Sequence, residues 1–342
     1  MIGVTGMMKA IAPGKIILSG EHAVLHGCPA VAMAIDRSAQ AIVTRTEGEG
    51  VSFDLQDFGC NESFTMRALR DLRHRISNNY HLFLDGRLGI REVILKPVDL
   101  MQYGFIMLMD GLHITLEHGL NVRMLSTIPI GCGMGSSAAS VLSELRAIGH
   151  YFRVDFRPEW HYRYSLEAEN IQHGKASGVD SYISLHGGCA RFQNGDAKTL
   201  PLLSGPLFLV HTGIPEASTG ECVAEVGKRF TGSGIWEEFT SVTTDFEIAL
   251  ATNNLEGIRK AVRRNHALLV RIGVVPPRVA QFINDVEKTG AVAKVCGAGT
   301  VIGEQAGMVL VISDAPPVAL CDTYGYEIVA VRGEPLGTRI VG

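Results

Sequence analysis

The run IPIGCGMGSSAAS, residues 128–140, has the composition of a loop that holds an anion. Its glycines alternate with Cys132 and Met134, and two serines precede a stretch of small residues typical of a helix start. Free N–H groups and the positive end of the dipole at a helix N-terminus attract phosphate or carboxylate. The alternative is a tight strand-to-helix turn without a ligand.

The run does not match the common phosphate-loop patterns. A Walker A loop needs a lysine after its last glycine, but Ser136 follows Gly135. The dinucleotide pattern G-x-G-x-x-G needs a glycine at position 136, and the H-R-D and D-F-G elements of protein kinases are absent. We therefore expect a phosphate loop of another type.

Two further segments carry groups suited to acid–base and metal chemistry. APGKIILSGEHAVLHG places Lys15 after a Pro-Gly turn at the start of a strand, with Glu21 and His22 just past its end. ENIQHGKASGVD begins with an acid near a helix end and closes with Asp180 in a glycine-rich loop. Taken singly, these groups are typical of a solvated lysine, a capping carboxylate and an Asx turn. Beside an anion-binding loop they become candidates for phosphoryl transfer, which depends on positioning and charge neutralisation.

The composition is that of a globular protein of about two domains. Of the 342 residues, 46% are hydrophobic and 19% charged, and the net charge of −4 gives no reason to expect nucleic-acid or membrane binding. No apolar run is long enough to span a bilayer, and the N-terminus lacks the pattern of a secretory signal. The seven scattered cysteines form no C-x-x-C pair, which favours reduced thiols in the cytoplasm over a zinc site.

The elements that must position these groups do not alternate steadily between strand and helix, which favours the α+β class. Periodicity predicts strands over 15–19, 29–35, 39–45, 51–55, 82–96, 113–128, 189–192, 206–212, 291–296, 308–313 and 326–332. It predicts helices over 63–79, 135–151, 158–172, 218–230, 236–250, 254–271 and 276–288. The composition changes near residue 195, where we expect a domain boundary.

In chain order, the segments APGKIILSGEHAVLHG, IPIGCGMGSSAAS and ENIQHGKASGVD resemble the motifs of the GHMP kinases, a family of small-molecule kinases. The first is similar to P-G-K-[VI]-I-L-x-G-E-H-A-V-[VL]-H-G, where galactokinases carry H-T-D-Y in place of H-A-V-L. The second is similar to P-x-G-x-G-L-G-S-S-A-A with Met134 for Leu, and the third to H-G-x-P-S-G-x-D with Ala176 for Pro. A fourth segment, TGIPEASTGECVAEV, resembles T-G-x-x-x-S-T. The match is closest to the members that phosphorylate mevalonate.

The resemblance implies an α+β, two-domain GHMP kinase fold with the active site in the cleft between the domains. The N-terminal domain, 1–193, would be a ribosomal-protein-S5-like α/β domain that binds ATP. The C-terminal domain, 194–342, would be a ferredoxin-like α+β domain. The resemblance also implies ATP and Mg²⁺, a small-molecule alcohol as substrate and a possible homodimer.

It implies roles for single residues as well. Asp180 would be the catalytic base, with Lys15 beside it to stabilise the developing alkoxide, although Lys15 alone could activate the alcohol. Ser137 and Glu169 would hold Mg²⁺. The ATP phosphates would be bound by Gly131, Gly133, Met134, Gly135, Ser136, Ser137 and Ala138. The acceptor would be bound by Glu21, His22, Ser177, Gly178, Ser218, Thr219, Gly297 and Ala298. Lys175 could either face solvent or bind a carboxylate.

One family motif, G-A-G-G-G-G-C near the C-terminus, is altered. Gly297, Ala298 and Gly299 are kept, but Thr300–Ile302 replace the glycines that follow. Bulky β-branched residues do not easily adopt positive φ, so we expect the loop to run differently from the family's.

The expected function is ATP-dependent phosphorylation of the primary hydroxyl of (R)-mevalonate to 5-phosphomevalonate, in isoprenoid precursor biosynthesis. The alternatives are a GHMP kinase for the tertiary hydroxyl of mevalonate, for phosphomevalonate or for a sugar. A non-catalytic ATP-binding relative is a further alternative. The presence of both a metal-binding acid and a base argues against it, because such a protein has no need of either.

Overall fold

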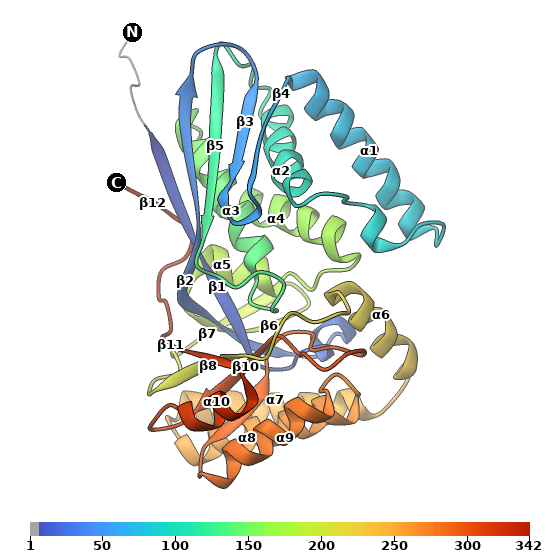
Figure 1. Cartoon of the computed structure of the whole chain (residues 1–342), viewed down its shortest axis with the longest axis vertical. Helices are drawn as coiled ribbons and strands as arrows, with labels where there is room; N and C mark the ends of the chain where they lie inside the picture. Colours follow the sequence, from blue (N-terminus) through green and yellow to red (C-terminus); the bar gives the residue numbers. More distant parts are fainter. Residues whose placement is uncertain (1–6) are drawn as a thin grey trace.

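Two β-sheets, one above the other in Figure 1, form the framework of the computed structural model, which describes residues 7–342. The strands are β1 (Met8–Ser19), β2 (Ala30–Thr46), β3 (Val51–Leu55), β4 (Cys60–Phe64), β5 (Gly119–Ser126), β6 (Cys189–Gln193), β7 (Asp196–Leu200), β8 (Leu207–His211), β9 (Val292–Val295), β10 (Met308–Ile312), β11 (Glu327–Val331) and β12 (Arg339–Val341). The helices are α1 (Met66–Leu84), α2 (Pro97–Gly111), α3 (Ser136–Tyr151), α4 (Pro158–His173), α5 (Val179–His186), α6 (Thr219–Arg229), α7 (Ile235–Ala251), α8 (Leu255–Arg271), α9 (Pro277–Lys288) and α10 (Val318–Tyr324). Three short 3₁₀ turns are η1 (Ala23–His26), η2 (Gln56–Phe58) and η3 (Ile90–Glu92).

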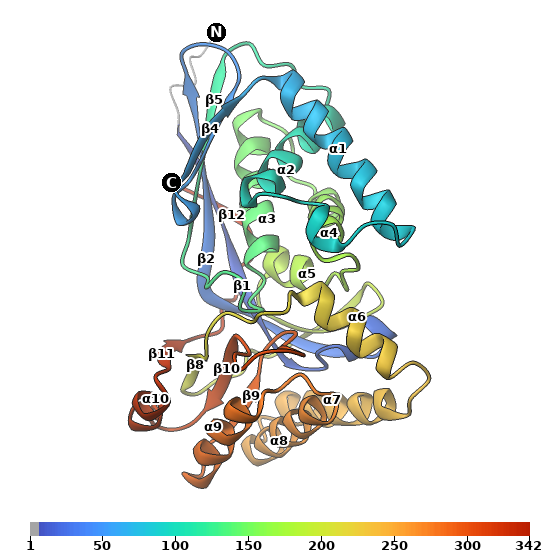
Figure 2. The same ribbon diagram turned by 45° about the vertical axis from the view of Figure 1, so that its right-hand side comes forward.

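The larger sheet has the order β12-β1-β2-β5-β3-β4, and β6 joins it through β2 and carries β7. All its pairs are antiparallel except β3 with β5. The two strands predicted over 29–35 and 39–45 are one strand, β2, which pairs with β6 through its first half and β5 through its second. Helices α1 to α4 lie on one side of this sheet (Figure 2).

The segment before the phosphate loop differs from the prediction. The strand predicted over 82–96 is wrong: this stretch holds the end of α1, a loop and η3. Helix α2, which follows, was not predicted. It is buried on nearly every side between its neighbours, and a helix that is apolar all round loses the 3.6-residue pattern by which helices are recognised.

The smaller sheet is antiparallel, with the order β11-β8-β10-β9. Helices α7, α8 and α9 lie below it in Figure 1. The predicted strands and helices from 206 to 332 are confirmed within a few residues, and α10 is an addition.

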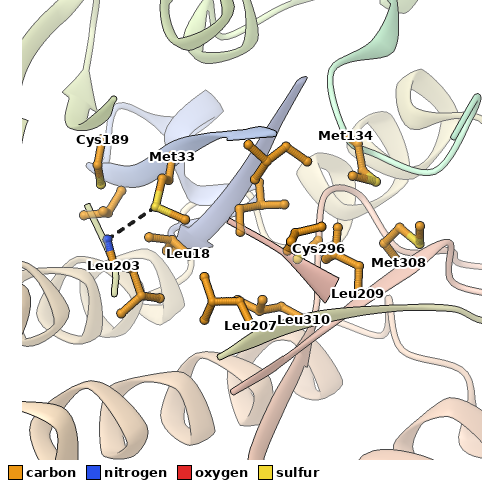
Figure 3. Close-up of a cluster of buried hydrophobic side chains, with 14 of the residues drawn as sticks. Leu18, Met33, Met134, Cys189, Leu203, Leu207, Leu209, Cys296, Met308 and Leu310 are labelled. Carbon is orange, nitrogen blue, oxygen red and sulfur yellow. Dashed lines mark hydrogen bonds between the residues drawn. The ribbon is translucent and has the colours of Figure 1, made fainter. Parts of the chain in front are cut away.

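One hydrophobic core joins the two sheets. Leu18 and Met33 of the larger sheet are buried against Leu207 and Leu310 of the smaller one, and Figure 3 shows these side chains gathered between the two layers. The backbone N–H of Leu203 donates to the sulfur of Met33 at 3.3 Å within this cluster.

The domain division at residue 193 stays a prediction. Strand β7 follows that residue and pairs with β6, and β12, near the C-terminus, pairs with β1 in the larger sheet. No helix within residues 7–342 combines the length and apolarity needed to cross a lipid bilayer. The expectation that the N-terminus is no secretory signal rests partly on the first six residues, which lie outside the described part.

Candidate active site

A cavity of about 460 Å³ opens between β1, the start of α3, the α4–α5 connection and the first turn of α6. It brings together most of the residues that the sequence singles out. Those lining it are Lys15, Glu21, His22, Gly131, Gly133, Met134, Gly135, Ser136, Ser137, Glu169, Ser177, Gly178, Asp180, Thr219, Gly297 and Ala298. The predicted residues that do not line it are Ala138 and Ser218.

Lys15 reaches the centre of this cavity from a β-bulge in β1. The register between β1 and β2 shifts between Pro13 and Lys15, and the Lys15 backbone N–H donates to the carbonyl of Met134 at 2.9 Å. Bulges of this kind re-aim a side chain at the rim of a site. The side chain is 3% exposed, and its Nζ lies 3.1 Å from Oδ2 of Asp180 while donating to the Gly133 carbonyl at 2.9 Å.

The glycine at 135 is what lets this pair form beside the loop. It has φ +69° and is the N-cap of α3, and a Cβ there would lie 3.0 Å from Cγ of Lys15 and 3.4 Å from Oδ2 of Asp180. A side chain would therefore crowd both members of the pair. Gly133 makes the same kind of close approach to the other half of the molecule, since its Cβ would lie 3.1 Å from Cα of Gly297.

The start of α3 can bind an anion through its backbone. The first amides of a helix have no acceptor within the helix, so the N–H groups of Ser136, Ser137 and Ala138 are available to a ligand. The side chains of Met134 and Ala138 are buried in the interior, so these two residues can take part only through their backbone.

Asp180 lies in the first turn of α5 and not in a loop, which corrects the prediction. Gly178 is the N-cap of α5 with φ +86°, and its missing side chain makes room for the hydroxyl of Tyr162, which would lie 2.2 Å from a Cβ. Glycine-rich composition thus concealed a two-turn helix. Placement in this helix fixes the carboxylate against Lys15.

Glu169 is a buried acid with spare coordinating capacity. It projects from α4, 3% exposed, and its Oε1 has no hydrogen-bond partner within the described part of the chain. Burial first, and the nearby Asp180 charge second, raise its pKa to about 8, while a hydrogen bond from Ser137 acts in the opposite direction. Mg²⁺ prefers hard oxygen ligands and keeps several waters. The orphaned oxygen and the serine hydroxyl therefore fit Mg²⁺. The described residues contain no cluster of three or more acidic, histidine or cysteine side chains that could hold the ion alone.

At the other end of the cavity, His22 and Glu21 are both held by the C-terminal half. His22 has φ +59°, and its Nε2 lies 2.9 Å from the carbonyl of Ala298, to which it donates as the neutral ring, because burial lowers its pKa to about 4. Both carboxylate oxygens of Glu21 are already engaged, Oε1 by Lys294 and Oε2 by Nδ2 of Asn265 at 3.0 Å. The prediction that Glu21 binds the acceptor stays a prediction.

Lys294 and Arg91 are two functional candidates that the sequence reasoning missed. Lys294 is a buried lysine inside the short apolar strand β9, a combination that could have signalled a buried ion pair. Arg91, in η3, lines the cavity and donates to Oε2 of Glu221 at 2.6 Å and to the carbonyl of Glu216 at 2.8 Å. It links the larger-sheet half to the start of α6.

Ser218 has a capping role. Its Oγ accepts from the Glu221 backbone at 3.3 Å and donates to the Glu221 carboxylate at 2.9 Å, which begins α6 and leaves Thr219 to line the cavity. In the altered loop, Gly297 and Gly299 have positive φ, whereas Thr300–Ile302 do not and lie outside the cavity lining. The Thr300 backbone instead donates to the Val274 carbonyl at 3.0 Å.

An apolar wall forms the rest of the cavity. Its residues are Leu55, Phe58, Ile90, Ile94, Leu95, Pro97, Leu100, Met101, Met124, Leu125, Pro129 and Ile130. No sequence motif marks them, because they come from three stretches that only the fold brings together. A wall of this kind suits the flat aromatic face of a ring such as a nucleotide base.

Known proteins resemble this chain in sequence and in fold. The family model described as GHMP kinases N terminal domain matches residues 100–188. A mevalonate kinase of Thermococcus sibiricus is 27% identical over 312 residues, covering 85% of this chain and 86% of the relative. A mevalonate kinase of Archaeoglobus fulgidus is 28% identical, covering 85% and 89%. The crystal structure of the Methanococcus jannaschii mevalonate kinase has a TM-score of 0.77 at 22% identity, over 97% of this chain and 99% of that one.

Residues 100–188 of the chain thus match a GHMP kinase domain, and the predicted α+β fold with two parts is confirmed. The relatives named above, which the chain matches along most of their length, are mevalonate kinases.

Proposed function

We propose that this protein is a mevalonate kinase that transfers the γ-phosphate of ATP to the primary hydroxyl of (R)-mevalonate. The products would be 5-phosphomevalonate and ADP, in isoprenoid precursor biosynthesis. The observation that carries the proposal is the Lys15–Asp180 pair, 3.1 Å apart, next to the exposed amides at the start of α3. A carboxylate, an ammonium group and the free amides of a helix start thus meet in one cavity.

Each group has a step to perform. The α3 amides would hold the ATP phosphates and aim the γ-phosphoryl group toward Asp180. The Asp180 carboxylate would accept the proton of the attacking hydroxyl, while Nζ of Lys15 stabilises the negative charge that develops on its oxygen. Ser137 and Glu169 would hold Mg²⁺, which when bound neutralises charge on the phosphate oxygens.

The test is turnover of ATP with (R)-mevalonate and Mg²⁺, with the product located by phosphorus NMR. Asp180→Asn should lower kcat about 10²- to 10⁴-fold, the usual contribution of a positioned base. Asp322→Asn, the same change on an exposed residue of α10 outside the cavity, should leave kcat unchanged. Phosphate on the tertiary hydroxyl would show that the acceptor binds in a different orientation, with that hydroxyl beside Asp180. ATP binding without turnover of any alcohol would refute a kinase.

Homodimerisation and a cytoplasmic location stay predictions. Light scattering on the purified protein checks the first, since a homodimer has twice the chain mass of 36.9 kDa.

A further inference from the structure

In the part of the chain that the structure describes, most of the cationic side chains around the cavity are paired with an acidic side chain, and one is not. Those that line it are Lys15, Arg91, Lys96 and Lys175. Lys15 is held by Asp180, and Arg91 and Lys96 each pair with a glutamate. Within residues 7–342, Lys175 makes neither an ion pair nor a hydrogen bond through its side chain, which is exposed to the cavity and solvent. Among the described residues of the lining, it is the one lysine whose charge is available to a ligand.

The histidines near this end of the cavity do not add positive charge. Burial lowers the pKa of His22 to about 4. The pKa of His26 is lowered by burial and then by the charge of Lys175. These rings are neutral near pH 7, so an anion in this region would meet Lys175 as its unpaired cation.

The backbone around Lys175 is held in place on both sides. The carbonyl of Gly174 accepts from the Tyr80 hydroxyl at 2.9 Å, and the amide of Ala176 donates to Oδ1 of Asn170 at 2.8 Å. Gly174 has no room for a side chain, because a Cβ would lie 2.6 Å from the ring of Phe83. The lysine therefore projects from a fixed point on the connection that leads into α5 and Asp180.

We infer that Lys175 binds the carboxylate of the acceptor and so selects a hydroxy acid over a neutral alcohol. The inference rests on the proposed function, because it assumes that the acceptor is the molecule phosphorylated beside Asp180. A charge-assisted hydrogen bond from the ammonium group to a carboxylate is short and strong compared with a neutral one. With the carboxylate held by Lys175, the far hydroxyl of a short hydroxy acid can extend toward the Lys15–Asp180 pair.

The experiment measures kcat and KM for Lys175→Met with two acceptors, mevalonate and its neutral amide. Losing a hydrogen bond to a charged group should raise the KM for mevalonate about 10- to 100-fold. The KM for ATP and the kinetics with the amide should stay as in the unmodified protein. Lys175→Arg should recover part of the loss, because it keeps the charge. Lys228→Met, an exposed lysine of α6 outside the cavity, is the matched control and should change nothing.

An equal loss with mevalonate and with the amide, or no loss with either, would overturn the inference while leaving the proposed function intact. If the unmodified protein does not phosphorylate mevalonate at all, the proposed function fails instead. The same comparison is then made by calorimetric binding of other hydroxy acids and their amides in the presence of a non-hydrolysable ATP analogue. Acid-selective binding that Lys175→Met abolishes would support the carboxylate receptor, and unselective binding would refute it.

Discussion

Replacing Glu144 by glutamine should make the stability of the protein less dependent on pH. Glu144 lies in the middle of α3 and is fully buried, and within the described residues neither of its carboxylate oxygens has a hydrogen-bond partner. A Cβ on Gly104 of α2 would lie 2.9 Å from Oε2, so the carboxyl is packed directly against that helix. Burial raises its pKa well above the ordinary value of 4.5.

The sign of the effect follows from which state binds the proton more tightly. Because the pKa of Glu144 is raised on folding, the folded chain keeps its proton in a pH range where the unfolded chain has lost it. Its contribution to stability is therefore full below pH 4.5 and falls as the pH rises toward the folded pKa. The free energy of unfolding falls by about 1.4 kcal/mol per pH unit in that window. Two pH units within it amount to about 3 kcal/mol, a large part of a typical domain's stability.

Urea unfolding of both proteins at pH 5, 6, 7 and 8 measures this contribution. Glu144→Gln keeps the side-chain shape and removes the titration, so its advantage over the unmodified protein should grow with pH, by up to about 1.4 kcal/mol per pH unit below the folded pKa. Glu256→Gln, on the exposed start of α8, should run parallel to the unmodified protein. If Glu144→Gln also ran parallel, the carboxyl would already be ionised in the folded state and the reasoning would be refuted.

Three further predictions follow from the contacts of the site. Gly135→Ala should lower kcat at least about tenfold, because its Cβ would crowd the Lys15–Asp180 pair. Gly188→Ala, with a similar positive φ but open space around it, should keep its kcat and lose only about 1 kcal/mol of stability. Equal kcat values for the two variants would contradict this reasoning. Glu21→Gln should lower the free energy of unfolding in urea by about 3–5 kcal/mol, because it leaves the buried Lys294 without its counter-charge. Replacing Lys294 by methionine as well should recover much of this loss. A change below about 1 kcal/mol in Glu21→Gln would show that the pair is unimportant for stability. Arg91→Ala and Glu221→Ala should each change the KM values less than about fivefold, because both side chains are exposed, and a double-mutant cycle should show that their effects are not additive.

The motifs of the sequence led to residues that line the cavity, although only some of these residues lie at the boundary of a regular element. Ser136 begins α3 and Glu169 stands near the end of α4, as the local patterns predict, whereas Lys15 lies at a bulge inside β1 and not after a turn at the start of a strand. Their convergence on one cavity came from the family resemblance and not from any local pattern.

What the sequence could not predict depends on contacts between distant segments. Lys294 and Glu21 are 273 positions apart, and neither residue type nor spacing indicates that they meet. Helix α2 escaped prediction because burial on all sides removes the polar stripe, and the helical setting of Asp180 was hidden by the glycines before it. The apolar wall was missed because its residues come from three separate stretches of the chain, which only the fold brings together.

The core shared by the two sheets restricts how the cavity can change size. A hinge motion that separated the two sheets would expose Leu18, Met33, Leu207 and Leu310 to water. Exposing each such side chain costs about 1.5–3 kcal/mol. Helix α6 has a different status: Figure 2 shows it standing between the two halves, and its start is tied to η3 by exposed side chains. The side of the cleft formed by the core is thus rigid, whereas the start of α6 is held to η3 by an exposed ion pair that costs little to break. Substrates should come and go by local displacement of the start of α6, and a compound bound behind that turn would slow product release without touching the phosphates.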